Sequence, residues 1–159
     1  MGLRVWLTVL AMLCPLAGSA QGMPQRSAGQ ALYLPVYSHI WHGEADSRGE
    51  RGKTLMSVLV SIRNTDPNRP IRINAATYFD TGGRRIKEYL AAPHALGPMA
   101  TFELFVPRSD DRGGSGANFV ITWKADTPVS PPVVEALHVN LPAGRSIAFI
   151  TSARPIAAE

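Results

Sequence analysis

The stretch from residue 55 to residue 86 constrains the fold most, because it holds two runs in which apolar side chains recur at every second position. Successive side chains of a β-strand point to opposite faces of a sheet, so each run predicts a half-buried strand. A turn rich in Asn, Asp and Pro separates the runs, and two glycines precede a short third strand over 84–89, which together predict a β-meander. The residues expected on the buried face are Met56, Val58, Val60 and Ile62 in the first run, and Ile71, Ile73, Ala75, Thr77 and Phe79 in the second.

Further runs with the same alternation complete the chain, over residues 31–39, 101–106, 117–124, 133–140 and 146–152. Turn residues recur between them, and no stretch has the spacing of an amphipathic helix. The sequence therefore predicts an all-β fold, an antiparallel β-sandwich of immunoglobulin-like type with about seven or eight strands. A closed barrel fits the same periodicity and stays open as an alternative. Phe105 points outward beside Glu103, which has an explanation only if that face of the sheet is also covered.

The first 20 residues have the organisation of a secretory signal peptide. Arg4 supplies the positive charge, residues 5–16 form an apolar core too short to span a bilayer comfortably, and small residues precede a cleavage site after Ala20. Cleavage removes Cys14, the one cysteine, and leaves no stable membrane anchor, so we expect a periplasmic or secreted protein without disulfides. The expected segments are the signal peptide 1–20, a disordered lead-in 21–30, one domain 31–154 and a C-terminal tail 155–159.

Charge and motifs narrow the class of function. The formal net charge is +4, and the arginines are scattered along the chain. A nucleic-acid-binding domain would carry a basic stripe with interleaved aromatic residues, so we expect no nucleic-acid partner. The GGSG sequence around Ser115 differs from the GxSxG of a serine hydrolase, and the glycine motifs that bind nucleotide phosphates are absent. We therefore expect that the protein is not an enzyme.

A pair of histidines, His39 and His42, is the sharpest candidate site. Carboxylates follow at Glu44 and Asp46, so the two imidazoles can supply ligands to zinc or copper if the chain turns irregularly at Trp41. In a regular strand, however, residues three apart point to opposite faces. The two histidines would then be loop residues beside a packed tryptophan.

A second candidate is the glycine-rich loop that contains Asp110, Asp111 and Arg112 and leads to Asn118. Glycine-rich backbone presents amides to an anion with Arg112 as a bidentate partner, and adjacent carboxylates alternatively suit calcium. The same residues also make ordinary hairpin loops, in which Asp side chains accept hydrogen bonds from their own backbone. We favour this structural role over a ligand loop.

Four ordered segments of the sequence, "LYLPVYSHIWHG", "SIRNTDPNRPIRI", "YFDTGG" and "DDRGGSGANFVITWKAD", resemble a bacterial family of small exported proteins known as domain of unknown function 3124. The resemblance covers roughly residues 30–154. It implies one exported domain. It implies no activity, ligand or catalytic residue.

Together these features predict an exported, non-catalytic binding or interaction module of the cell envelope. Its partner would be an unknown envelope or extracellular protein, and its exposed aromatic residues would include Tyr33, Tyr37 or Trp41. The alternative is a periplasmic protein that binds zinc or copper through His39 and His42. No other cofactor is expected.

Overall fold

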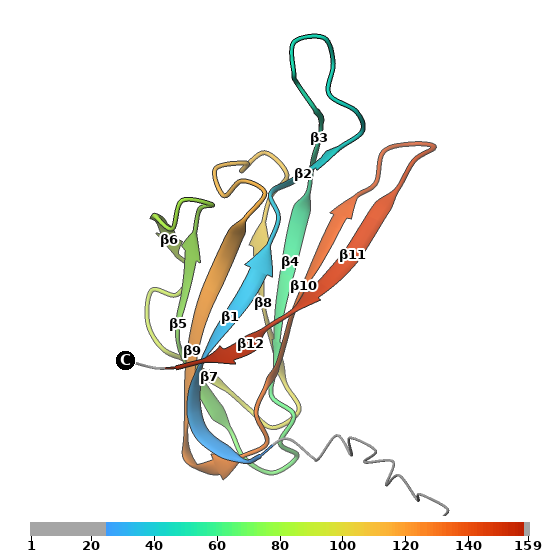
Figure 1. The fold of residues 1–159 in the computed structure, drawn as a ribbon. Coiled ribbons are helices and arrows are strands. Elements are labelled where there is room, and N and C mark those ends of the chain that lie inside the picture. Colours follow the sequence, from blue (N-terminus) through green and yellow to red (C-terminus); the bar gives the residue numbers. More distant parts are fainter. Residues whose placement is uncertain (1–24, 158–159) are drawn as a thin grey trace, which may run out of the picture.

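The computed structural model describes residues 25–157, which form two main antiparallel sheets and a small two-stranded sheet (Figure 1). One main sheet has the strand order β12–β1–β9–β5–β6, with β7 also paired to β5, and the other has the order β11–β10–β4–β8. The strands are β1 (Ser27–Val36), β2 (His39–His42), β3 (Gly52–Leu55), β4 (Ser57–Arg63), β5 (Ile71–Phe79), β6 (Arg85–Glu88), β7 (His94–Leu96), β8 (Thr101–Val106), β9 (Ala117–Val129), β10 (Val133–Asn140), β11 (Ile147–Ser152) and β12 (Arg154–Ile156).

The all-β prediction is confirmed for the described residues, and the barrel alternative is wrong, because the main sheets keep separate edges. No helix in residues 25–157 is long and apolar enough to cross a membrane. The predicted signal peptide lies outside the described residues.

The two main sheets enclose one apolar core. The inward side chains of β4 and β9 are those that the alternation predicts, and Trp123 is the largest fully buried residue. Burying one such side chain stabilises the fold by about 1.5–3 kcal/mol, so the core accounts for most of the favourable free energy of folding. The central members are Leu32, Leu34 and Val36 of β1, Val58, Val60 and Ile62 of β4, and Phe119, Ile121 and Trp123 of β9.

The second alternating run differs from the prediction in two ways. It forms β5, which pairs with β9 and lies in the opposite sheet from β4, so the turn between the two runs crosses from one sheet to the other. The pairing of β5 with β9 also shifts register between Ile73 and Ala75. This irregularity adds a residue to one strand and reverses the faces beyond it. Ala76 and Tyr78 are therefore buried, where the sequence predicted Ala75 and Thr77.

Both ends of the domain extend further than predicted. β1 begins at Ser27 and pairs with β9, so part of the predicted disordered lead-in is strand. The absence of a side chain at Gly29 permits this pairing, because a Cβ there would lie 2.8 Å from the carbonyl oxygen of Trp123. At the other end β12 pairs with β1, so the predicted C-terminal tail is also partly strand.

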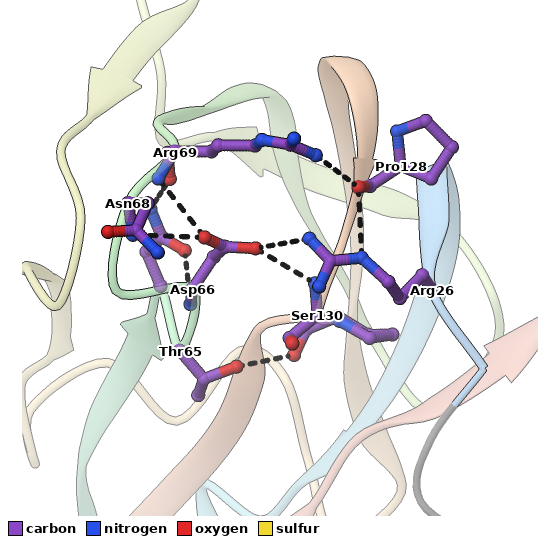
Figure 2. Close-up of polar contacts among 9 residues, drawn as sticks. Arg26, Thr65, Asp66, Asn68, Arg69, Pro128 and Ser130 are labelled. Carbon is purple, nitrogen blue, oxygen red and sulfur yellow. Dashed lines mark hydrogen bonds and ion pairs between the residues drawn. The ribbon is translucent and has the colours of Figure 1, made fainter.

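The sheet-crossing turn after β4 is built around the buried carboxylate of Asp66 (Figure 2). The backbone N–H groups of Asn68 and Arg69 donate to Oδ1 at 3.0 and 3.1 Å, and Arg26 Nη2 donates to Oδ2 at 2.8 Å. The hydrogen bond from Asn68 is the main cause that holds the pKa of Asp66 below its usual value. Since Ser130 N also donates to Oδ2, one carboxylate joins the residue before β1, the crossing turn and the connection after β9.

Candidate functional site

Three loops meet at the end of the domain opposite the Asp66 turn, where the β2–β3 hairpin projects beyond the main sheets (Figure 1). They are the β1–β2 connection, the β5–β6 turn and residues 107–116, which we call the glycine loop. The Gly114 carbonyl accepts the N–H of Ser38 at 3.0 Å, and the Gly113 carbonyl accepts the N–H of Thr81 at 2.9 Å. Three of the four family-like segments therefore contact one another at this end.

Close packing fixes the glycine loop. The hydroxyls of Tyr78 and Ser38 share a buried hydrogen bond of 2.9 Å directly beneath Gly113. A Cβ on Gly113 would collide with the Tyr78 hydroxyl and would lie 2.6 Å from Ser38 Oγ. Burial raises the pKa of Tyr78, so this hydroxyl stays neutral beneath the loop.

The structure does not bring the four predicted ligand-loop residues together. Arg112 donates to both carboxylate oxygens of Asp110, at 2.8 and 2.6 Å, and Lys53 of the hairpin binds Asp111 at 2.9 Å. Asn118 lies within β9, paired with Pro35 and Phe79. The hydrogen bond from Arg112 lowers the pKa of Asp110, and the hydrogen bond from Lys53 lowers that of Asp111. The Asp side chains therefore make ion pairs within the protein.

The predicted metal-binding histidines are also separated. His39 is buried, and its ring packs edge-on against Trp41 with centroids 4.9 Å apart. Burial lowers the pKa of His39, and the charge of Lys53 lowers it further. His42 lies three residues along the strand, on the opposite face, and its Nε2 is 2.9 Å from Thr54 Oγ1. β2 is a regular strand without the irregular turn that a shared metal needs, and residues 25–157 hold no cluster of three or more potential ligands.

The projecting hairpin carries an open pocket of about 570 Å³. The rim of this pocket includes Trp41, whose ring is exposed, together with Glu50, Arg51 and Lys53. Asp46 orders the hairpin tip by accepting the N–H groups of residues 48 and 50, so the segment is a structured loop. Of the aromatic residues that the sequence suggested for contact, Tyr37 instead packs edge-on against the rings of His138 and Phe149.

A second pocket, of about 390 Å³, lies between the β5–β6 turn and the glycine loop and is lined by three arginines, Arg84, Arg85 and Arg112, with Asp80 and Ile86. We call it the arginine pocket. The sequence suggests Arg112 as an anion ligand and places Arg84 and Arg85 in the short strand predicted over 84–89. No sequence motif predicts that residue 112 lies near residues 84 and 85. Their proximity arises from the pairing of β5 with β9, in which Phe79 faces Asn118.

The outer face of the four-stranded sheet carries a continuous line of apolar side chains. Leu59 of β4 pairs with Phe105 of β8 on one side and with Leu137 of β10 on the other, and Leu137 pairs with Ile150 of β11. These four residues, which we call the apolar row, therefore cross the whole sheet on one face. Phe105 is 56% exposed and Ile150 is 60% exposed. The outward direction predicted for Phe105 is confirmed.

Comparison with known proteins identifies the family without naming an activity. A Thermotoga maritima protein of known crystal structure, Thermotoga maritima 1070, aligns over 79% of this chain and 92% of its own length, at 10% identity and a TM-score of 0.44. No curated protein matches the sequence. The family model described as "Protein of unknown function (DUF3124)" matches residues 29–156, which is most of the chain. The chain therefore belongs to the DUF3124 family.

Proposed function

We propose that the protein is an exported, non-catalytic interaction module of the cell envelope, which binds another envelope or extracellular protein through the apolar row. In this proposal the signal peptide is cleaved, the mature protein is periplasmic or secreted, and the two main sheets form an immunoglobulin-like sandwich. The observation that carries the proposal is the alignment of four apolar side chains in one line across an outward sheet face. Such a face is normally polar when it contacts water.

The surroundings of the row suit a protein contact. Glu103, Ser61, Glu135 and Ser152 form the next line of paired residues on the same face, so the row has a polar border on this side, whereas the line on its other side contains Ser57, Val139 and Ala148. An apolar centre with a polar rim is the usual anatomy of a protein interface. Arg63 neutralises Glu135, whereas no ion pair of Glu103 occurs among the described residues, so this border keeps one uncompensated negative charge. We therefore expect the partner to present an apolar strip with a basic side chain beside it.

The size of the row favours a transient contact over a stable dimer of this chain. Four neighbouring strands spaced about 4.8 Å apart give a row about 15 Å long. A stable interface covers about 800 Å² on each partner, which is more than four side chains supply. The row thus suits a transient partner, with affinity supplemented by its charged border.

The titratable groups support a non-catalytic role. A carboxyl group that acts as a general acid at neutral pH needs a raised pKa. Hydrogen bonds from Asn68, Arg84 and Arg112 instead hold the pKa values of Asp66, Asp80 and Asp110 below their usual range.

Site-specific photocrosslinking in living cells tests the proposal. A benzophenone amino acid replaces Phe105 or Ile150 in separate variants, and the matched control replaces Arg72, which is exposed on β5 of the other sheet. We expect one discrete adduct with another protein from both row positions, weakened by Leu137→Ser and absent from the control. Adducts of equal intensity from position 72, a product only of twice the chain mass, or no adduct would contradict the proposal.

A further inference from the structure

We propose that the arginine pocket is a binding site for a phosphate group, carried on a small molecule or on a lipid headgroup. This inference is independent of the apolar row, which lies on a different part of the surface. It follows from how the three arginines and their carboxylate partners are arranged.

In each of the three ion pairs made by these arginines, the carboxylate side chain is more buried than the arginine side chain. The Arg84 side chain is 87% exposed and its partner Asp80 is 10% exposed. The corresponding values are 62% for Arg85 against 24% for Glu88, and 64% for Arg112 against 14% for Asp110. Two segments, the start of β6 with the neighbouring Arg84 and Arg85 and the glycine loop with Arg112, thus place guanidinium groups outermost. An approaching anion meets these positive charges before it meets the carboxylates.

Hydrogen bonds within the fold already occupy the carboxylates. Asp80 accepts the N–H groups of Gly82 and Arg84, both at 2.9 Å. Glu88 accepts the N–H of Ala76 at 2.7 Å and the Thr77 hydroxyl at 2.6 Å. Their negative charge is therefore directed toward the sheet and its turn. The three arginines are matched in number by three carboxylates, so the positive character of the pocket comes from the outer position of the guanidinium groups.

The arginines keep unused N–H groups for a ligand. Among the hydrogen bonds of the described residues, the side chain of Arg84 uses only Nε, and that of Arg112 uses Nε and Nη2. Arg85 makes only a long ion-pair contact of 3.5 Å to Glu88. Each guanidinium carries five N–H donors, so several remain available at the pocket. The existing ion pairs hold the arginine side chains in place and reduce the entropy that ligand binding would cost.

The geometry favours phosphate over a carboxylate ligand. A single guanidinium satisfies the two coplanar oxygens of a carboxylate in a bidentate pair. Three guanidiniums from two segments suit a tetrahedral group with three terminal oxygens and about two negative charges. A volume of about 390 Å³ also leaves room for the molecule that carries the phosphate.

The first experiment is a titration of the mature protein with inorganic phosphate at constant ionic strength, followed by nuclear magnetic resonance. We expect saturable shifts confined to the amides of residues 80–86 and 110–114 and to the side-chain Nε signals of the three arginines. The double variant Arg84→Gln/Arg112→Gln should bind at least about tenfold more weakly, because it loses two charge-assisted contacts. Each replaced side chain is mostly exposed, and circular dichroism checks that the variant is folded.

The matched control is Arg145→Gln/Arg154→Gln, which removes the same charge from two exposed positions outside the pocket. A parallel arm uses vesicles of phosphatidylcholine with phosphatidic acid, compared with phosphatidylcholine and phosphatidylglycerol of equal surface charge. Binding of inorganic phosphate that is lost only in the pocket variant supports a soluble ligand. Pocket-dependent binding only to phosphatidic acid supports a lipid headgroup. No binding in either arm, or equal loss in the control variant, would overturn the proposal.

Discussion

The stability of the protein should fall by about 3 kcal/mol between pH 6.5 and pH 4 because of one buried histidine, His138. Its side chain on β10 points into the core and is fully buried. Nε2 accepts the backbone N–H of Tyr37 at 3.1 Å, and the ring stacks on Phe149 with centroids 4.5 Å apart. Nε2 must be unprotonated to accept this hydrogen bond, so the fold selects the neutral imidazole. Burial lowers the pKa of His138 to about 4, from an ordinary value of 6.5.

The sign and the magnitude follow from proton linkage. Between pH 6.5 and pH 4 the unfolded chain binds a proton at this site and the folded chain does not, so acidification favours unfolding. The pKa difference is about 2.5 units at 1.36 kcal/mol each, which gives about 3 kcal/mol in total. The contribution is complete above pH 6.5 and is lost by about pH 4. Acidic groups with lowered pKa values, such as Asp66 and Asp80, cause losses only at lower pH, below their ordinary value of 3.8.

Urea denaturation of wild type and His138→Phe, measured from pH 8 to pH 4.5, tests this reasoning. The variant keeps an aromatic ring against Phe149 but leaves the N–H of Tyr37 without its acceptor, which costs about 1–3 kcal/mol at every pH. The readout is therefore the pH dependence and not the absolute free energy of unfolding. His39→Phe measures the smaller share of the other histidine whose pKa burial lowers, and His42→Phe is the exposed control. Equal pH dependence in wild type and His138→Phe would refute the argument.

Three further predictions concern the glycine loop, the apolar row and the crossing turn. Gly113→Ala should lower the free energy of unfolding by roughly 1–3 kcal/mol in urea denaturation, whereas Gly97→Ala, whose added Cβ meets no atom within 4 Å, should not show the same clash penalty. Ile150→Ser should change the free energy of unfolding by less than about 0.5 kcal/mol, and a larger loss would mean that the row serves folding. Asp66→Asn should reduce the loss of stability that occurs below pH 3.8, because the ionised carboxylate stabilises the fold until it is protonated at its lowered pKa. If stability falls equally steeply below pH 3.8 in the variant and in the wild type, this role is contradicted.

The alternation in the sequence determined which side chains of a regular strand share a face. Val58, Val60 and Ile62 are buried, as are Phe119, Ile121 and Trp123, and Phe105 points outward. These predictions succeeded because the direction of a strand side chain depends only on its position along the strand. The candidate site was predicted less well. The sequence suggested Arg112 as an anion ligand, but it grouped this arginine with Asp111, which binds Lys53, and with Asn118, which lies within β9.

Only the tertiary structure decided which strands are neighbours, because strand pairing joins segments that are far apart in the sequence. It placed β4 and β5 in different sheets and shifted the register of β5 after Ile73, so that Tyr78 became a core residue. The same pairing placed Arg84 and Arg85 beside Arg112, and the register of four strands aligned the apolar row. The period of two in a strand fixes the face of each side chain, whereas its neighbours depend on register and sheet order, which no local pattern encodes.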